Sequence, residues 1–217
     1  MNAKKELAAL ELKAFTAVFE DGLWDVYLGL MLLGMGVSIL LDDLGYWLSE
    51  YWILIFSPLL ILPILLKKWI TVPRMGVVKF GSKRRYRVLL TVVLFFFIFL
   101  AGLTLYRSPD RPFYILDVPI TRSAFIWFHS TLLIFCIAAF LLNFNRLYLY
   151  SILFALPYPF RMIMKQAPGW SVASSSLFFI SAAIIMVIGL RLLRQFLRKY
   201  SRRATAVLLS EVNGGIE

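Results

Sequence analysis

Long apolar runs separated by short polar stretches dominate this chain from residue 23 to residue 190. A helix needs ~20 residues to cross ~30 Å of hydrocarbon, and most of these runs approach that length. The pattern predicts an all-α integral membrane protein, a bundle of about six transmembrane helices. The predicted spans lie at about 23–41, 51–66, 88–105, 123–142, 147–164 and 171–190.

Residues 1–22 precede the first span and carry a different pattern. Apolar side chains recur at helical spacing on one face, at Leu7, Leu10, Ala14 and Val18. Charged side chains share the opposite face, which predicts an N-terminal amphipathic helix at the membrane surface. A cytoplasmic extension of the first span is the alternative. The mixture of charged and apolar residues argues against a cleavable signal peptide.

Prolines interrupt two of the predicted spans, Pro58 and Pro63 in the second and Pro157 and Pro159 in the fifth. A proline removes a backbone donor and is tolerated in lipid only where neighbouring groups satisfy the freed carbonyls. Both spans are therefore predicted to pack inside the bundle. The fifth span has two interpretations, a broken helix that crosses fully and a re-entrant helix. A proline-containing loop is predicted at 106–122.

The composition supports lipid as the solvent. Of the 217 residues, 61% are hydrophobic and only 16% are charged, whereas a soluble domain has ~45–50% apolar and ~25% charged residues. A net charge of +11 would suggest a nucleic-acid partner in a soluble protein. The basic residues lie beside the apolar runs, however, where loop charge orients membrane insertion. No nucleic-acid partner is therefore predicted.

The positions of the basic residues also predict the orientation. If the stretch 67–87 is cytoplasmic, most of the 23 basic residues fall on the same side, and the acidic turn Asp42–Glu50 falls outside. The positive-inside rule favours that arrangement. It places a multi-pass protein in the cell (cytoplasmic or inner) membrane with both termini in the cytoplasm. Residues 191–217 then form a basic cytoplasmic tail.

The stretch 67–87 contains eight basic residues and no acidic one. A polybasic segment near a membrane gains about 1 kcal/mol per Lys or Arg from anionic lipid. The residues predicted to bind anionic lipid or a partner protein are Arg74, Lys79, Lys83, Arg84, Arg85 and Arg87. A turn at Pro73 and Gly76 would present the first two to Glu20, Asp21 and Asp25, taken as surface carboxylates. The alternative is a loose loop that is basic only because it orients the protein.

Two ionisable residues lie inside predicted spans, Asp25 and His129, and they form the candidate intramembrane polar site. Asp21 is predicted to cap the first span, which puts Asp25 in the first turn, where the helix dipole favours a carboxylate. An acid that faces a polar pocket is the alternative. His129 is interpreted as a neutral side chain hydrogen-bonded within the bundle, and a proton route is its alternative.

Small residues mark faces where helices approach closely in lipid. The predicted faces are Gly29, Gly34, Gly36 and Ser38 in the first span and Ser171, Ser175, Ala182 and Gly189 in the sixth. Such faces serve packing within one chain or between the subunits of a homo-oligomer.

The sequence contains no catalytic or metal-binding signature. Cys136 is the only cysteine, so disulfides and cysteine-based metal sites are excluded. With a single histidine, neither a metal nor a cofactor is predicted. The sequence has no HExxH, P-loop, GxSxG or GxGxxG motif, so we predict that the protein is not an enzyme.

Two segments resemble a group of uncharacterised prokaryotic multi-span membrane proteins. One is Phe19–Asp25, which contains DGLWD at the start of the first span, and the other is Val72–Phe80, which contains PRMGVVKF. The resemblance is confined to the first part of the chain. It implies no activity, substrate or cofactor, but it suggests that the two cytoplasmic-side segments act together.

The sequence leaves two functions open. The favoured one is a non-catalytic polytopic membrane protein whose basic cytoplasmic face binds anionic lipid or a partner protein. The alternative is a small-solute or ion transporter that uses the proline-broken second and fifth spans. A transporter needs polar groups at mid-membrane, and the predicted spans offer only Ser57, His129, Thr131 and Ser151 there.

Overall fold

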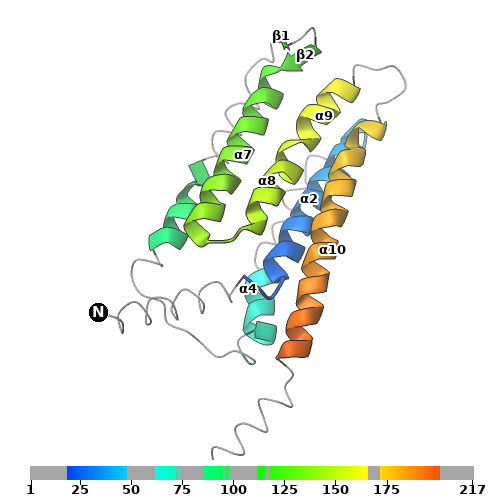
Figure 1. Cartoon of the computed structure of the whole chain (residues 1–217). Coiled ribbons are helices and arrows are strands. Elements are labelled where there is room, and N and C mark those ends of the chain that lie inside the picture. Colours follow the sequence, from blue (N-terminus) through cyan, green and yellow to red (C-terminus); the bar gives the residue numbers. More distant parts are fainter. Residues whose placement is uncertain are drawn as a thin grey trace, which may run out of the picture.

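The computed structural model describes residues 19–47, 62–71, 73, 86–94, 96–97, 112–115, 118–165 and 172–200. The long helices pack side by side as a bundle (Figure 1), and they are α2 (Leu23–Asp43), α7 (Arg122–Leu142), α8 (Arg146–Ala155), α9 (Pro157–Met164) and α10 (Ser176–Lys199). The shorter elements are α4 (Leu62–Leu66), the π-helix η3 (Lys67–Thr71), the 3-10 helix η4 (Val172–Ser175), β1 (Pro112–Ile115) and β2 (Val118–Thr121). Residues 86–94 and 96–97 are also helical.

Four helices in the described part of the chain are long and apolar enough to cross a membrane: Leu23–Asp43, Arg122–Leu142, Arg146–Met164 and Ala173–Lys199. They correspond to the first, fourth, fifth and sixth predicted spans. The mostly helical fold predicted from the apolar runs is therefore confirmed at these four places. Of the second and third predicted spans, the structure describes residues 62–66, 88–94 and 96–97, which are helical; the rest lies outside the described residues.

The fifth predicted span is a helix with a break at Leu156, where α8 meets α9. The backbone ladder continues across the break, because the Leu156 amide donates to the Ile152 carbonyl at 3.0 Å and the Phe160 amide donates to the Leu156 carbonyl at 3.1 Å. Pro157 begins α9, and because its nitrogen has no hydrogen to donate to the preceding turn, the break falls at this position. α8 and α9 together run along the length of the bundle (Figure 1), as the broken-helix interpretation predicts.

Two boundaries differ from the sequence-based prediction. The segment predicted as a loop at 106–122 contains an antiparallel hairpin, in which Pro112 pairs with Thr121 and Ile115 with Val118. Its prolines are tolerated because a two-stranded ribbon consists of edge strands. Helix α10 ends at Lys199, nine residues beyond the predicted end of the sixth span at 190. Basic residues in its last turn, which the sequence assigned to the tail, favour this extension through the helix dipole.

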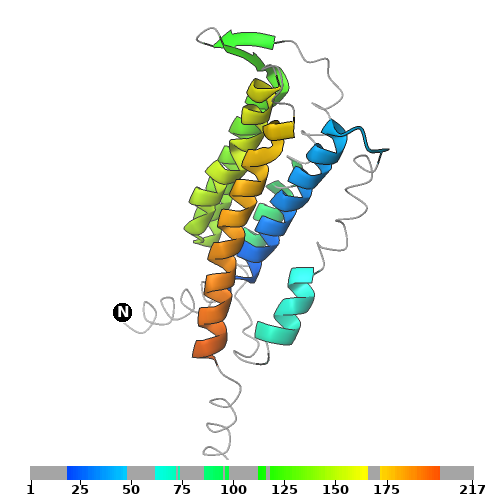
Figure 2. The ribbon, with the colours of Figure 1, turned by 90° about the vertical axis from the view of Figure 1, so that its right-hand side faces the viewer.

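Helices α2 and α10 lie side by side over most of their length (Figure 2). Glycines on both helices allow the close approach: a Cβ atom built on Gly189 would lie 2.6 Å from the Val26 amide nitrogen, and one on Gly36 would lie 3.0 Å from the Phe178 Cβ. Gly29 faces Met186 and Ala182 in the same way. Four of the small residues predicted to mark a packing face, Gly29, Gly36, Ala182 and Gly189, therefore lie at an interface within the chain. Ser171 of the predicted set lies outside the described residues.

The turn between α7 and α8 brings these two helices side by side. Asn143 adopts a left-handed conformation with φ of 51°, which ends α7 and reverses the chain into α8. The core between α2, α7, α8 and α10 is then filled by apolar and aromatic side chains, with Phe135 stacked on Phe154 at a ring separation of 4.9 Å. Phe178 and Ile185 of α10 are completely buried in this core.

Candidate functional site: buried ion pairs at the two ends of α2

The first of two buried polar clusters lies where α2 begins. Gly22, with φ of 73°, precedes the helix, and the Asp21 carboxylate accepts a hydrogen bond from the Leu23 amide at 3.1 Å. The N-cap position is therefore occupied by Gly22 and not by Asp21 as predicted, although the Asp21 carboxylate, one residue earlier, binds the first amide of the helix. The other Asp21 oxygen accepts a hydrogen bond from the Thr71 hydroxyl at 2.9 Å and lies 3.1 Å from the Lys67 ammonium. Asp21 thus ties the start of α2 to the π-helix η3.

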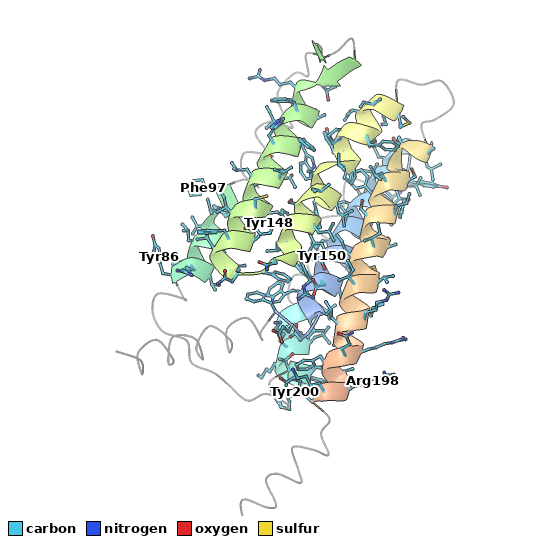
Figure 3. The ribbon with its side chains drawn as sticks, in the orientation of Figure 1. Tyr86, Phe97, Tyr148, Tyr150, Arg198 and Tyr200 are labelled. Carbon is cyan, nitrogen blue, oxygen red and sulfur yellow. The ribbon has the colours of Figure 1, made fainter. Side chains whose placement is uncertain are left out.

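Asp25 lies in the first turn of α2, as predicted, and joins α2 to α8. The Tyr150 hydroxyl donates to one carboxylate oxygen at 2.6 Å, and the Arg146 guanidinium lies 3.0 Å from the other. Tyr150 extends from α8 toward this part of α2 (Figure 3). Arg146 also donates to the Phe19 carbonyl and lies over the Phe144 ring, 4.8 Å from its centroid.

We call Asp21, Asp25, Lys67, Arg146 and Tyr150 the α2-start cluster. Asp21 and Asp25 are completely buried, so the expectation that they are surface groups is wrong. Glu20, the third of the expected surface carboxylates, is exposed. Removing one partner of a buried ion pair strongly destabilises a protein, because the remaining charge has lost its solvation without compensation. The α2-start cluster therefore constrains how α2, η3 and α8 meet.

The environment of Lys67 is mostly apolar. Its ammonium lies 5.5 Å from the Trp24 ring centroid and 5.8 Å from the Phe19 ring centroid, within the range of cation–π attraction. Burial lowers the pKa of Lys67, and the attraction of Asp21 partly offsets that effect. The ion pair with Asp21 therefore stabilises the charged form that burial disfavours.

A second polar cluster lies where α2 ends. Asp43 is contacted by the Arg161 guanidinium at 2.8 Å and by the Lys165 ammonium at 2.7 Å, and it accepts a hydrogen bond from the Ser174 hydroxyl at 3.3 Å. Arg161 also reaches the more exposed Asp42 at 3.4 Å. We call these five residues the α2-end cluster. It ties the end of α2 to α9 and η4, so α2 is held by ion pairs at both ends of the bundle.

The two members of the predicted intramembrane polar site do not meet. Asp25 belongs to the α2-start cluster, whereas His129 lies on an exposed face of α7, in the half of that helix nearer its beginning. The His129 Nδ1 atom is 2.9 Å from the Phe125 carbonyl of the same helix, and its ring lies against Phe125 with centroids 4.0 Å apart. The predicted hydrogen bond is therefore made within α7 itself.

The predicted lipid-binding residues fall mostly outside the described residues. This applies to Arg74, Lys79, Lys83, Arg84 and Arg85. Arg87 is described and is exposed in the helical segment at 86–94. Of the three carboxylates proposed to receive Arg74 and Lys79, Asp21 contacts Lys67 and Asp25 contacts Arg146.

The partners of the buried carboxylates were missed by sequence reasoning. Lys67, Arg146, Arg161 and Lys165 were counted only as charges that orient the protein, and Tyr150 was not singled out. A usable signal was present, because a carboxylate inside an apolar helix requires a partner on a neighbouring helix. The described residues contain no group of three His, Cys, Asp or Glu side chains placed to hold a metal ion.

Comparisons with known proteins do not extend the assignment. No family model matches the chain, and no curated protein and no solved structure matches it significantly.

Proposed function

We propose that the chain is a six-span, non-catalytic membrane protein whose basic cytoplasmic face binds anionic lipid. The proposal is supported by the different charge at the two ends of the bundle. At the end where α2 and α8 begin, the exposed cations among the described residues are Lys68, Arg87, Arg191, Arg194, Arg198 and Lys199. At the opposite end, the described cations are Arg122, which is exposed, and Arg161 and Lys165, which both contact Asp43. The positive-inside rule assigns the α2-start end to the cytoplasm.

Helix α10 carries the observation on which the proposal rests. Its exposed face is apolar for its first part, at Ile180, Ile184, Val187 and Leu190, and becomes cationic for its last part, at Arg191, Arg194, Arg198 and Lys199. One helix face that changes from apolar to cationic fits a span that leaves the hydrocarbon and enters the head-group region. Arg198 lies near the end of this helix (Figure 3).

The packing between the two polar clusters favours this proposal over a transporter. A transport route needs polar groups and water-filled space near the bundle centre. In the described part of the chain, that region is filled by the aromatic side chains of Phe135, Phe154 and Phe178. The polar side chains Thr131 and Ser151 are also buried, and the Ser151 hydroxyl donates to the Tyr148 carbonyl of its own helix at 2.6 Å.

Thermal unfolding in nanodiscs tests the proposal. We expect the full chain to melt roughly 5 °C higher in phosphatidylcholine containing phosphatidylglycerol than in phosphatidylcholine alone, because cations near an anionic surface are stabilised. Changing Arg191, Arg194, Arg198 and Lys199 together to glutamine should remove the difference. Raising the salt to about 1 M, where the Debye length is about 3 Å, should weaken it.

A matched variant distinguishes charge from side-chain shape. Lysine in place of Arg191, Arg194 and Arg198 keeps the charge and should keep the stabilisation by phosphatidylglycerol. If the wild-type protein melts at the same temperature in both lipids, the anionic-lipid proposal is wrong. The proposal would then be that the same basic face binds a partner protein.

A further inference from the structure

A pocket of about 240 Å³ opens beside the α2-start cluster. It lies between the segment before α2, the α7–α8 turn and the last part of α10, and its lining residues are Phe19, Glu20, Asn143, Phe144, Asn145, Arg146 and Leu192. Leu192 lies on α10 between Arg191 and Arg194, in the part of the helix whose exposed face is cationic. The pocket is therefore at the level that the proposed function assigns to lipid head groups.

The charge around this pocket differs from that of the surrounding basic surface. The segment before α2 and its first turn contribute three carboxylates, Glu20, Asp21 and Asp25. Asp21 contacts Lys67 and Asp25 contacts Arg146, so these two carboxylates are each balanced by a cation. Glu20 adds a third negative charge. Glu20 is exposed and lines the pocket. A cationic group is therefore favoured at this position, even though the whole protein is strongly basic.

Two aromatic rings form an apolar wall of the same pocket. Phe19 and Phe144 both line it, and their rings stack with centroids 5.2 Å apart. The Lys67 ammonium lies over the Phe19 ring and the Arg146 guanidinium over the Phe144 ring, so each ring already contacts a cation. The attraction for a bound ammonium group therefore comes from the Glu20 carboxylate.

The opposite part of the lining supplies hydrogen-bond donors. Asn143 and Asn145 are exposed on the α7–α8 turn, and their amides can donate to an oxyanion. The Arg146 guanidinium has five N–H donors, and its observed partners are the Phe19 carbonyl and the Asp25 carboxylate. Donors therefore remain for a phosphate beside the position favoured by an ammonium group.

We propose that this pocket binds the head group of a phospholipid that carries a primary ammonium. The ammonium lies against Glu20, and the phosphate lies against Asn145 and Arg146. A primary ammonium donates three hydrogen bonds and a quaternary one donates none, so the carboxylate favours phosphatidylethanolamine over phosphatidylcholine. This inference rests on the proposed membrane crossing, but it is independent of the binding of anionic lipid by α10.

The full chain in nanodiscs provides the test, with phosphatidylcholine as the matched zwitterionic lipid. We expect phosphatidylethanolamine to raise the melting temperature over pure phosphatidylcholine and to be retained preferentially in native mass spectrometry. Glu20→Gln should lower that retention about fivefold, as expected for loss of one partly screened ion pair. Asp42→Asn removes the same charge at the opposite end of α2 and should keep the preference.

Three results would overturn this assignment. Equal retention of the two lipids by the wild-type protein would exclude selection of a primary ammonium. An unchanged preference in Glu20→Gln would attribute the lipid effect to the bilayer rather than to the pocket. An equal rise in melting temperature with soluble glycerophosphoethanolamine in phosphatidylcholine nanodiscs would assign the pocket to a soluble ligand. Stabilisation by phosphatidylglycerol should persist in Glu20→Gln, so failure of this inference and failure of the proposed function are distinguishable.

Discussion

Replacing Arg146 with methionine is expected to lower the free energy of unfolding by about 3 kcal/mol, because the completely buried Asp25 would lose its charged partner. The hydrogen bond from Tyr150 would remain, but one neutral donor does not compensate a buried carboxylate. Asp25→Asn should cost less, since the Arg146 side chain is 27% exposed and can turn toward water. The measurement is denaturant unfolding of the purified variants in one detergent.

The double variant tests whether Asp25 and Arg146 stabilise the protein as an ion pair or independently of each other. If Asp25 and Arg146 act as a pair, combining Arg146→Met with Asp25→Asn should recover part of the stability lost in Arg146→Met alone. Losses that simply add in the double variant would mean that the two side chains contribute independently. That outcome would contradict the role assigned to the α2-start cluster.

Replacing Gly189 with alanine is expected to destabilise the contact between α2 and α10. The new Cβ atom would lie 2.6 Å from the Val26 amide nitrogen and 3.0 Å from the Asp25 Cβ, so the helices must separate to accept it. Overpacking typically costs about 1–3 kcal/mol, and we expect the upper part of this range because backbone blocks the new atom. Thermal unfolding in detergent measures the loss.

Two substitutions serve as controls for the change at Gly189. Ala183→Leu adds more volume on an exposed face of α10 and should change the melting temperature little. Gly45→Ala meets no atom within 4 Å, so only its φ of 76° should contribute to any loss. A Gly189→Ala protein that melts with the wild type would contradict the close α2–α10 packing.

The apolar runs were sufficient to locate the long helices, because helical periodicity and span length are local properties of the sequence. They located α2 and α7 within two residues at each end, and the prolines of the fifth span marked the break at Leu156. The end of α10 was missed because its arginines indicated a tail, although they also extend a helix on its cationic face. The hairpin at 112–121 was missed because its strands are short and contain prolines.

The candidate site was predictable only in part, for a different physical reason. The first-turn position of Asp25 follows from neighbouring residues, and so does the placement of Asp21 beside the start of α2, one residue before the N-cap Gly22. The partner Tyr150 is 125 residues from Asp25, and Arg161 is 118 residues from Asp43. Such pairs depend on which helices become neighbours, and local patterns carry no information about that choice.

The central claim is that the helices cross a membrane with the α2-start end in the cytoplasm. Single cysteines in a Cys136→Ala background test it directly, at Tyr46 after the end of α2 and at Lys199 near the end of α10; both positions are exposed. We expect an impermeant maleimide to label Tyr46→Cys in intact cells and Lys199→Cys only after the membrane is opened. Labelling of Lys199→Cys in intact cells, with Tyr46→Cys protected, would contradict the orientation. Equal labelling at both positions would contradict the crossing itself.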